Sequence, residues 1–445
     1  MTTAADLTHG PIRRQLIALA LPLLAGNILQ QLYNTIDAVI VGRFVGDGAF
    51  AAVGVAGSVM NLFLFLISGG CSGAGVLLAQ LHGAGDGPAF RRDFFLTSLF
   101  GGLLTLGLTA AALLLLSPLL VLLRTPAAIR GFATDYLHII FLGFLAAFAF
   151  HLGSAVLRAV GSTGAALVFL MVSMGTNLTL DLAFIVGLGM GVAGAAWATV
   201  LAQALAALLC LTYLARRFPQ LMFHREDMAY DGPLLRRTAH FSLVSALHMC
   251  NLYIGKLLVQ GAVNSLGTEA ISAYTAATRI EGFANSFGDS GHTAVSVFIG
   301  QNTGAGDQER VREGFFTGQR LLAVFGLFMS LLMLVGAVPT LKLVLPQNSG
   351  GSLGPAVGYL RLVACFYLFN FLGSGLAGYF QGRGRVNIPV IGATGHITLR
   401  VILSWLLAPR LGLPAVALAT GLGWVGVVTF WSLLYSRENT SAKQA

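Results

Sequence analysis

The chain has 445 residues, of which 56% are hydrophobic and 10% are charged, whereas a soluble domain has roughly 25% charged residues. Such a chain cannot cover a water-facing surface, so a soluble globular protein is excluded and most of the solvent must be lipid. The net charge of +9 is not a nucleic-acid signature, because the basic residues fall in alternate loops between apolar segments.

Twelve segments are long and apolar enough to span a membrane, which takes about 20 residues for a hydrocarbon core of roughly 30 Å. The first is too long for a signal peptide and is expected to be a retained helix. Because backbone groups in lipid must bond within their own segment, we predict an all-α integral membrane protein with twelve transmembrane helices. In chain order the predicted spans are Gln15–Val41, Phe50–Leu78, Phe94–Leu116, Phe132–Val156, Ala165–Leu188, Val192–Ala215, Thr238–Ala262, Ala270–Ile299, Phe315–Val335, Ala356–Phe380, Ile388–Ala408 and Ala415–Leu434.

The loops on one side of these spans hold most of the arginines, and the opposite loops hold few. By the positive-inside rule, this places both termini in the cytoplasm of a multi-pass protein of the plasma (bacterial inner) membrane. The expected partners are membrane lipids and a small molecule, with no nucleic acid, and the expected state is a monomer. The opposite loops contain Arg43, Arg124, Arg130, Lys342 and Arg410.

One short polar loop occurs twice: residues 79–95 read AQLHGAGDGPAFRRDFF and residues 300–316 read GQNTGAGDQERVREGFF, 221 positions later. We therefore predict two homologous six-helix lobes, residues 1–215 and 238–445, joined by a cytoplasmic loop at 216–237. Since six is even, both lobes insert in the same orientation, with a pseudo-twofold along the membrane normal and a cavity between them. Asp86 and Asp307 are predicted to cap the helices that follow. The same spacing relates Gly46 to Gly267, Gly161 to Gly382 and Gly191 to Gly412.

Motifs of enzymes and pumps do not fit. Residues 189–194 match GxGxxG, but no strand precedes them, and small residues at this spacing suit close helix packing. The sequence has no GxxxxGK[ST], HExxH or GxSxG motif, so neither an enzyme nor an ATP-driven pump is predicted, and no cofactor is expected beyond a coupling ion. The four cysteines fall within predicted spans and are expected to be buried thiols: Cys71, Cys210, Cys250 and Cys365.

Acids inside predicted spans point to function, because a carboxylate at mid-membrane costs about 2.5–3.5 kcal/mol. Asp37 lies in the first span, Asp181 in the fifth with Asn177 one turn earlier, and Thr199 in the sixth. At 1.5 Å per residue, Asp37 lies roughly 6 Å below the outer helix end, and Asp181 and Thr199 roughly 10 Å. These oxygens suit a proton or a small hard cation such as Na⁺, with Asp37, Asn177, Asp181 and Thr199 as ligands. The alternative is a hydrogen-bond network that only fixes helix packing.

The second half lacks these groups. Leu258, Thr398 and Ile402 stand 221 positions after Asp37, Asn177 and Asp181, so cation coupling is expected in the first half only. Instead, the seventh and eighth spans carry Lys256, Glu281 and Asp289. These three are candidates for the substrate cavity, and a Lys256–Glu281 ion pair that only serves packing is an equal alternative.

Several of these features together resemble the multidrug and toxic compound extrusion (MATE) family, over nearly the whole chain. They are Pro22 fifteen residues before Asp37, the pair Asn177-x-x-x-Asp181, the doubled GAGD loops, and the stretches LRAVGSTG at 157–164 and FQGRGR at 380–385. The resemblance implies a V-shaped pair of lobes that exports organic cations and drugs by alternating access in exchange for H⁺ or Na⁺. It also implies a cation site at Tyr33, Asp37, Asn177, Asp181 and Thr199, and a bend of the first helix at Pro22.

Some family members use a second acidic site in helices seven and ten. Here those helices offer Lys256 and uncharged residues such as Asn370 and Ser374, so this chain departs from that pattern. The alternative function is a flippase for lipid-linked precursors, although such proteins tend to have extra helices and a strongly basic cavity. A scaffold protein without transport is a third class, which leaves Asp37 and Asp181 unexplained.

Overall fold

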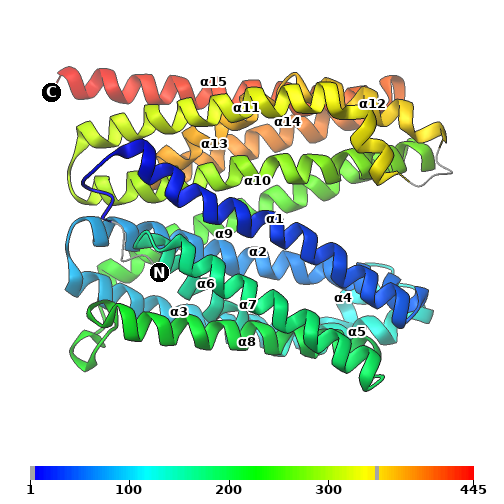
Figure 1. Cartoon of the computed structure of the whole chain (residues 1–445), viewed down its shortest axis with the longest axis horizontal. Coiled ribbons are helices and arrows are strands. Elements are labelled where there is room, and N and C mark those ends of the chain that lie inside the picture. The colour runs from blue at the N-terminus through cyan, green and yellow to red at the C-terminus, as the bar shows by residue number, and fades with distance from the viewer. Residues whose placement is uncertain (1–5, 346–349, 445) are drawn as a thin grey trace. The chain divides into compact units, whose positions relative to one another are not determined.

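A computed structural model describes residues 6–345 and 350–444 (Figure 1). Within these ranges the chain forms helices joined by short turns, and no residue lies in a strand. The predicted all-α class is confirmed.

The chain forms two compact units that exchange the beginnings of two helices. The first unit contains Ala25–Ala246, and the second contains Leu7–Leu24 and the residues from Leu247 onward. Helix α1 (Ile12–Phe44) and helix α9 (Gly232–Asn264) therefore each begin in one unit and end in the other. The predicted lobes divide the chain at the loop 216–237, whereas the compact units follow these crossings.

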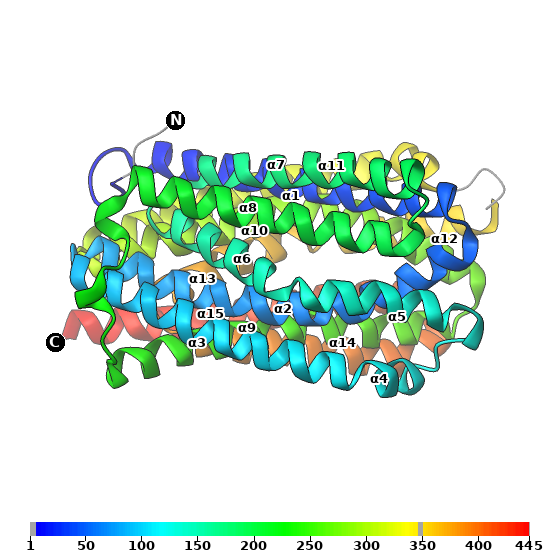
Figure 2. The ribbon, with the colours of Figure 1, turned by 90° about the horizontal axis from the view of Figure 1, so that it is seen from below.

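Each unit is a bundle of neighbouring helices. In the first unit α2 packs against α5 and α6, and α8 packs against α6 and α7; in the second, α10 packs against α11 and α13, and α14 against α15 (Figures 1 and 2). The first unit contains α2 (Asp47–Gly83), α3 (Gly87–Leu114), α4 (Leu116–Leu122), α5 (Ala127–Leu142), α6 (Phe144–Ala159), α7 (Thr163–Asp181), the π-helix η1 (Leu182–Gly187), α8 (Gly191–Arg217), and the 3₁₀ turns η2 (Pro219–Leu221) and η3 (Arg225–Asp227). The second contains α10 (Thr268–Gly304), α11 (Gln308–Val344), α12 (Gly350–Ala364), α13 (Tyr367–Gly382), α14 (Asn387–Leu411) and α15 (Leu413–Gln444).

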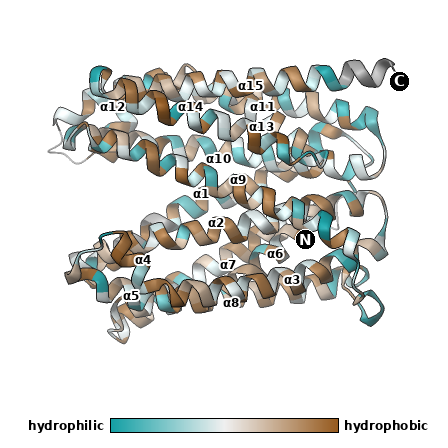
Figure 3. Ribbon diagram, turned by 180° about the vertical axis from the view of Figure 1, so that it is seen from behind, coloured by the Kyte–Doolittle hydropathy of each residue, from teal (hydrophilic) through white to brown (hydrophobic). Residues whose placement is uncertain are grey.

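Twelve of these segments suit a membrane span. Nine described helices are long and apolar enough singly, and the pairs α5–α6 and α12–α13 qualify when each is counted as one span, bent by 50° and 49°. The twelfth is α10, which has 37 residues but carries several charged side chains. Apolar residues run along the helices, and hydrophilic residues gather at their ends and in the loops (Figure 3). The predicted twelve helices are confirmed, although helices such as α2 and α11 extend beyond the predicted spans because polar residues continue them.

The repeated loop has the same structure in both halves. The Asp86 carboxylate accepts a hydrogen bond from the Ala89 N–H at 3.0 Å, and the Asp307 carboxylate accepts one from the Arg310 N–H at 2.9 Å. Both acids therefore cap the next helix, as predicted. The turn before each cap needs a positive φ, which glycine adopts without strain. The glycines concerned are Gly85 (70°) and Gly306 (77°).

The register between the halves shifts further along the chain. Gly161 has a positive φ of 74°, and the glycine with the matching conformation in the second half is Gly384, at 79°. The predicted match of Gly161 to Gly382 is thus wrong by two residues. The offset arises in the outer connections after α3 and α11, which differ in length by two residues. The connection through η1 in the first half is two residues longer than its counterpart, so Gly191 and Gly412 are again 221 residues apart.

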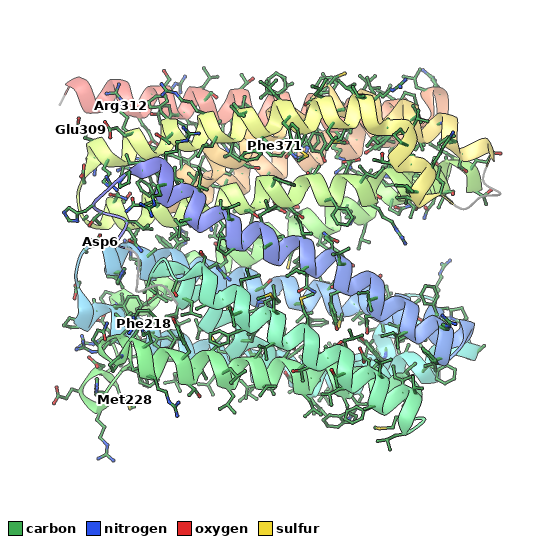
Figure 4. The ribbon with its side chains drawn as sticks, in the orientation of Figure 1. Asp6, Phe218, Met228, Glu309, Arg312 and Phe371 are labelled. Atoms are coloured by element: carbon green, nitrogen blue, oxygen red, sulfur yellow. The ribbon has the colours of Figure 1, made fainter. Side chains whose placement is uncertain are left out.

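Aromatic side chains fill the interior of each unit. In the first, the rings of Phe63, Phe141 and Phe144 lie 5.1–5.7 Å apart. In the second, Phe371 on α13 is fully buried (Figure 4). With lipid around the protein, such contacts stabilise mainly through close packing rather than removal from water.

The cysteines differ in burial. Cys71 and Cys210 are buried, as expected, but Cys250 is half-buried and Cys365 is exposed. The expectation fails for Cys365 because this residue lies at the bend between α12 and α13, where the helix surface opens. Cys71, Cys210 and Cys365 are free thiols.

Candidate functional site

The structure brings the five predicted coupling residues together inside the first unit. Tyr33 and Asp37 lie one turn apart on α1, and Asn177 and Asp181 lie one turn apart on α7, so each pair shares a helix face. The Tyr33 hydroxyl lies 2.6 Å from the Asn177 side-chain amide. Thr199 on α8 completes the group, so three helices contribute to one site.

The neighbours of Asn177 fix its orientation. Oδ2 of Asp181 lies 2.8 Å from one end of the amide, and the backbone N–H of Thr199 lies 3.0 Å from the other. An N–H can only donate and an ionised carboxylate can only accept, so the amide nitrogen faces Asp181 and the amide oxygen faces Thr199. The Thr199 hydroxyl donates to the Ala195 carbonyl at 3.0 Å, which leaves its lone pairs for another donor or a cation.

The two carboxyl groups are only partly satisfied. Asp181 is 0% exposed and Asn177 is 2% exposed. Oδ1 of Asp37 and Oδ1 of Asp181 are both buried without a hydrogen-bond partner among the described residues, and the two carboxyl groups are close enough to interact directly. Two charged carboxylates in a buried site repel one another. A proton or a small cation between them relieves this repulsion.

Tyr136 on α5 also belongs to this site, although the sequence analysis did not single it out. Its side chain is 4% exposed, its hydroxyl lies 4.0 Å from Sδ of Met60, and the charges of Asp37 and Asp181 act on it electrostatically. No spacing rule links α5 to α1 or α7, because the contact depends on how the helices cross. The sequence contained no signal for it.

The positions 221 residues after Asp37 and Asp181 are apolar and exposed: Leu258 on α9 is 47% exposed and Ile402 on α14 is 49% exposed. In α7 and α14, however, the offset of two residues makes Ser404, not Ile402, the counterpart of Asp181. Ser404 is buried but carries no charge, and Leu258 is apolar, so the structure offers no second copy of the carboxyl pair at these positions.

The predicted cavity residues of the second half differ in exposure. Glu281 on α10 is 6% exposed, and its Oε1 has no hydrogen-bond partner within the described ranges. Lys256 and Asp289 are exposed. No ion pair joins Lys256 to Glu281 in the part of the chain that the structure describes, so the alternative of a packing ion pair is not realised.

Arg400 on α14 is the cation with the strongest electrostatic influence on Glu281, ahead of Lys256. Its Nη2 donates to the Tyr274 hydroxyl at 3.2 Å, and the Tyr274 ring lies 5.4 Å from the ring of Tyr359. An arginine in the middle of the predicted span Ile388–Ala408 was a usable signal that the sequence analysis missed, since a cation at that depth needs a counter-charge or polar partners.

Comparisons with known proteins agree with this architecture. The MatE family model matches the chain twice, over residues 22–183 and 245–406. The chain is 28% identical over 426 residues to the probable multidrug resistance protein YpnP of Bacillus subtilis, covering 95% of this chain and 94% of that protein. It is 25% identical over 329 residues to an FAD transporter of Shewanella oneidensis, covering 72% and 71%.

A solved structure described as the outward-facing conformation of a multidrug resistance MATE family transporter superposes with a TM-score of 0.91 and covers 99% of both chains. Its sequence identity is 21%, so this likeness shows the fold alone. The family model, by contrast, matches most of the chain, with one match in each half. The chain therefore belongs to the MatE family, the multidrug and toxic compound extrusion transporters.

Proposed function

We propose that this protein exports amphipathic organic cations by antiport with H⁺ or Na⁺, and that Asp37 and Asp181 are the coupling pair. The observation that carries the proposal is the pair of buried carboxyl groups, each with one unpartnered oxygen, on two different helices. Tyr33, Asn177 and Thr199 supply the surrounding neutral oxygens and the amide. Such a set of oxygen atoms accepts a proton or a hard cation.

The coupling step follows from the charge of the pair. Without an ion, the two carboxylates repel each other, and the arrangement that separates them is favoured. With an ion bound, the repulsion is removed and the two carboxylates can approach each other. Because Asp37 lies on α1, this approach changes the bend of α1. Pro22 removes one hydrogen bond of α1 fifteen residues before Asp37, so the helix has a built-in place to bend. Ion and substrate then bias two conformations in opposite directions, as antiport requires.

Glu281, Lys256 and Asp289 are proposed to line the substrate cavity. Asp289 is the exposed carboxylate of the three, so it is the acid that an organic cation can approach directly. Glu281 has Arg400 beside it, which weakens its attraction for a positively charged substrate. We expect Asp289→Asn to reduce cation recognition more than Glu281→Gln does.

The decisive experiment uses purified protein in liposomes with an imposed H⁺ or Na⁺ gradient. A fluorescent organic cation should move against its own gradient, and Asp37→Asn should stop that movement. Assays with FAD and with a lipid-linked precursor provide the contrasting substrates. Transport of either of these without any transport of cations would overturn the proposed substrate class.

The proposed orientation places both termini and the loop after α8 in the cytoplasm of a bacterial inner-membrane protein. Reporter tags inserted after Gln220 and at the C-terminus should be cytoplasmic. A tag at Asn348, which lies outside the described residues, should be external. A Gln220 tag found outside would contradict the charge argument.

A further inference from the structure

The beginning of α9 is held by the first unit through a buried carboxylate that the coupling proposal does not use. Asp93 on α3 is 0% exposed. Its Oδ1 accepts a hydrogen bond from the Thr238 hydroxyl, and its Oδ2 has no partner among the described residues. Next to this contact, Nη2 of Arg237 donates to Oε1 of Gln80 at 2.7 Å. These four residues, from α2, α3 and α9, are called the α9 seat below.

The loop that leads into α9 is fixed to the same end of α3 (Figure 4, near Phe218 and Met228). Arg91 lies 2.8 Å from Oδ2 of Asp227 and, as the principal cause, lowers the pKa of that carboxyl. Arg92 lies 3.3 Å from Oδ2 of Asp231, and Oδ1 of Asp231 accepts from the Leu234 N–H at 3.0 Å. These contacts fix the position of the loop and cap the first turn of α9, so α9 begins next to the α9 seat.

Beyond the seat, α9 touches α2 backbone to backbone. A Cβ atom on Gly73 would lie 2.2 Å from the Phe241 carbonyl oxygen and 2.8 Å from Cα of Ser242. No side chain fits in that space, so glycine is required for the approach. The glycine lets the two backbones approach closely, and the first part of α9 is packed at this level, with Phe241 buried.

The beginning of α1 has an equivalent seat in the second unit. The backbone of Leu7 bonds to Gln301 at 3.3 Å and to Asn302 at 3.2 Å, and Arg310 donates to the Leu7 carbonyl at 3.0 Å. Gln301 stands 221 residues after Gln80. The repeated loop therefore holds the first helix of the other half in each case, which gives its duplication a structural reason.

The two crossing helices differ where they pass from one unit to the other. In α1, Pro22 lies two residues before the crossing at Leu24, so this helix can bend there. Helix α9 crosses after Ala246, and its only proline is Pro233, its second residue. An uninterrupted helix resists a sharp kink. Transport that changes the relative position of the two units can therefore bend α1 at Pro22, whereas in α9 it requires residues 232–246 to leave the α9 seat.

We propose that Asp93 is a positioning residue of the transport cycle: the α9 seat holds residues 232–246 on the first unit, and its release is a required step of the cycle. This inference rests on the proposed transport function, because a protein that does not cycle has no need to release the seat. Oδ2 of Asp93 has no partner among the described residues in the present conformation, so this carboxyl can take a different partner when the α9 seat opens.

The first test is a reversible crosslink. The four native cysteines are replaced by serine, and Asp93→Cys is combined with Thr238→Cys, since two short side chains in direct contact fit a disulfide. In liposomes, oxidation should slow gradient-driven dye transport roughly tenfold, the factor expected when one obligatory step is blocked in most molecules, and a reductant should restore it. The single-cysteine variants are the controls and should not respond to oxidant.

Equal transport by the fully crosslinked and the reduced protein overturns the proposal, and so does failure of the disulfide to form. A protein in which neither wild type nor variants move the dye refutes the transport function instead, so the two failures are distinguishable.

The second test measures hydrogen exchange and does not depend on transport. Thr238→Val keeps the shape of the side chain but removes the bond to Asp93, so amides in 232–246 should exchange roughly tenfold faster, as expected for the loss of a hydrogen bond to a buried carboxylate. Arg236→Gln is the matched control, because the exposed Arg236 makes no contact in the seat. Identical exchange in the two variants would show that the α9 seat does not hold the helix.

Discussion

The first half of the chain carries carboxyl groups at Asp37 and Asp181, whereas the second half has Leu258 and, after the two-residue offset, Ser404 at the corresponding positions. The helices of the two halves correspond: α1 and α9 have 33 residues each, α2 and α10 have 37 each, and the bends of α5–α6 and α12–α13 differ by one degree. Duplication has thus preserved the scaffold, but not the chemistry inside it.

The second half has its own buried polar group, in a different place. Glu281 and Arg400 lie on α10 and α14, with Tyr274 and Tyr359 beside them. There, the acid and the cation belong to the same unit and influence each other electrostatically, although no ion pair joins them within the described ranges. The two acids of the first half also form no ion pair with a cation among the described residues. This contrast supports the proposal that the coupling ion binds in the first half.

The largest effect should come from removing an acid of the first half. Asp37→Asn is expected to reduce gradient-driven dye transport in liposomes to the level of protein-free vesicles, because the pair then can no longer carry the coupling charge. Asp181→Asn should act in nearly the same way. Leu258→Asn introduces the same side chain at the matching position of the second half and should leave coupling intact. A full gradient response by Asp37→Asn would move the search to Glu281 and Asp289.

A stability effect should follow from unbalancing the second half. Arg400→Gln removes the hydrogen bond to the Tyr274 hydroxyl and the cation that acts most strongly on the buried Glu281 carboxyl, so it should lower the free energy of unfolding by about 1 kcal/mol. Glu281→Gln should cost less, and the double variant should recover most of the loss. Thermal unfolding of the purified protein in detergent measures all three. Simple additivity of the two changes would show that Arg400 and Glu281 do not compensate each other.

Equal effects are expected where the halves are alike. Asp86→Ala and Asp307→Ala each remove a helix cap of the same geometry and should each cost about 1 kcal/mol. The same unfolding measurement applies, with Glu309→Ala, in the first turn of α11 but without the capping bond, as the reference. A large difference between the two caps would mean that the repeated loops differ energetically despite their matching hydrogen bonds.

The smallest effect concerns the ion pair of the connecting loop. Because Arg91 lowers the pKa of the Asp227 carboxyl, the pair stabilises the protein above the ordinary carboxyl pKa, and the contribution is lost as the pH falls through the lowered value. Asp227→Asn should therefore reduce stability at pH 7 by less than about 1 kcal/mol, since the arginine is partly exposed. The difference from wild type should vanish in strong acid. A difference that persists there would show that the contribution is not ionic.

The sequence predicted the features that local rules determine. Helix class, number of spans, caps at Asp86 and Asp307, and the i, i+4 pair Asn177 and Asp181 follow from composition and periodicity. Contacts between helices were not predictable in this way. Tyr136 meets the carboxyl pair through the crossing of α5 with its neighbours, and Asp93 meets Thr238 across 145 residues. Such contacts depend on the angles at which helices cross, and the sequence of one helix does not determine these angles.

The crossing of α1 also constrains how the protein is made. Residues of the first helix are synthesised early, yet the hydrogen bonds of Leu7 join it to residues 294 to 303 positions further along the chain. The contacts that hold the segment before α1 therefore cannot form until α10 and α11 have been synthesised. This is a slow, long-range closure of the kind that limits folding rates. Fragments cut at the connecting loop would each lack the partner of one helix, so neither half should reach its final structure unless both are present.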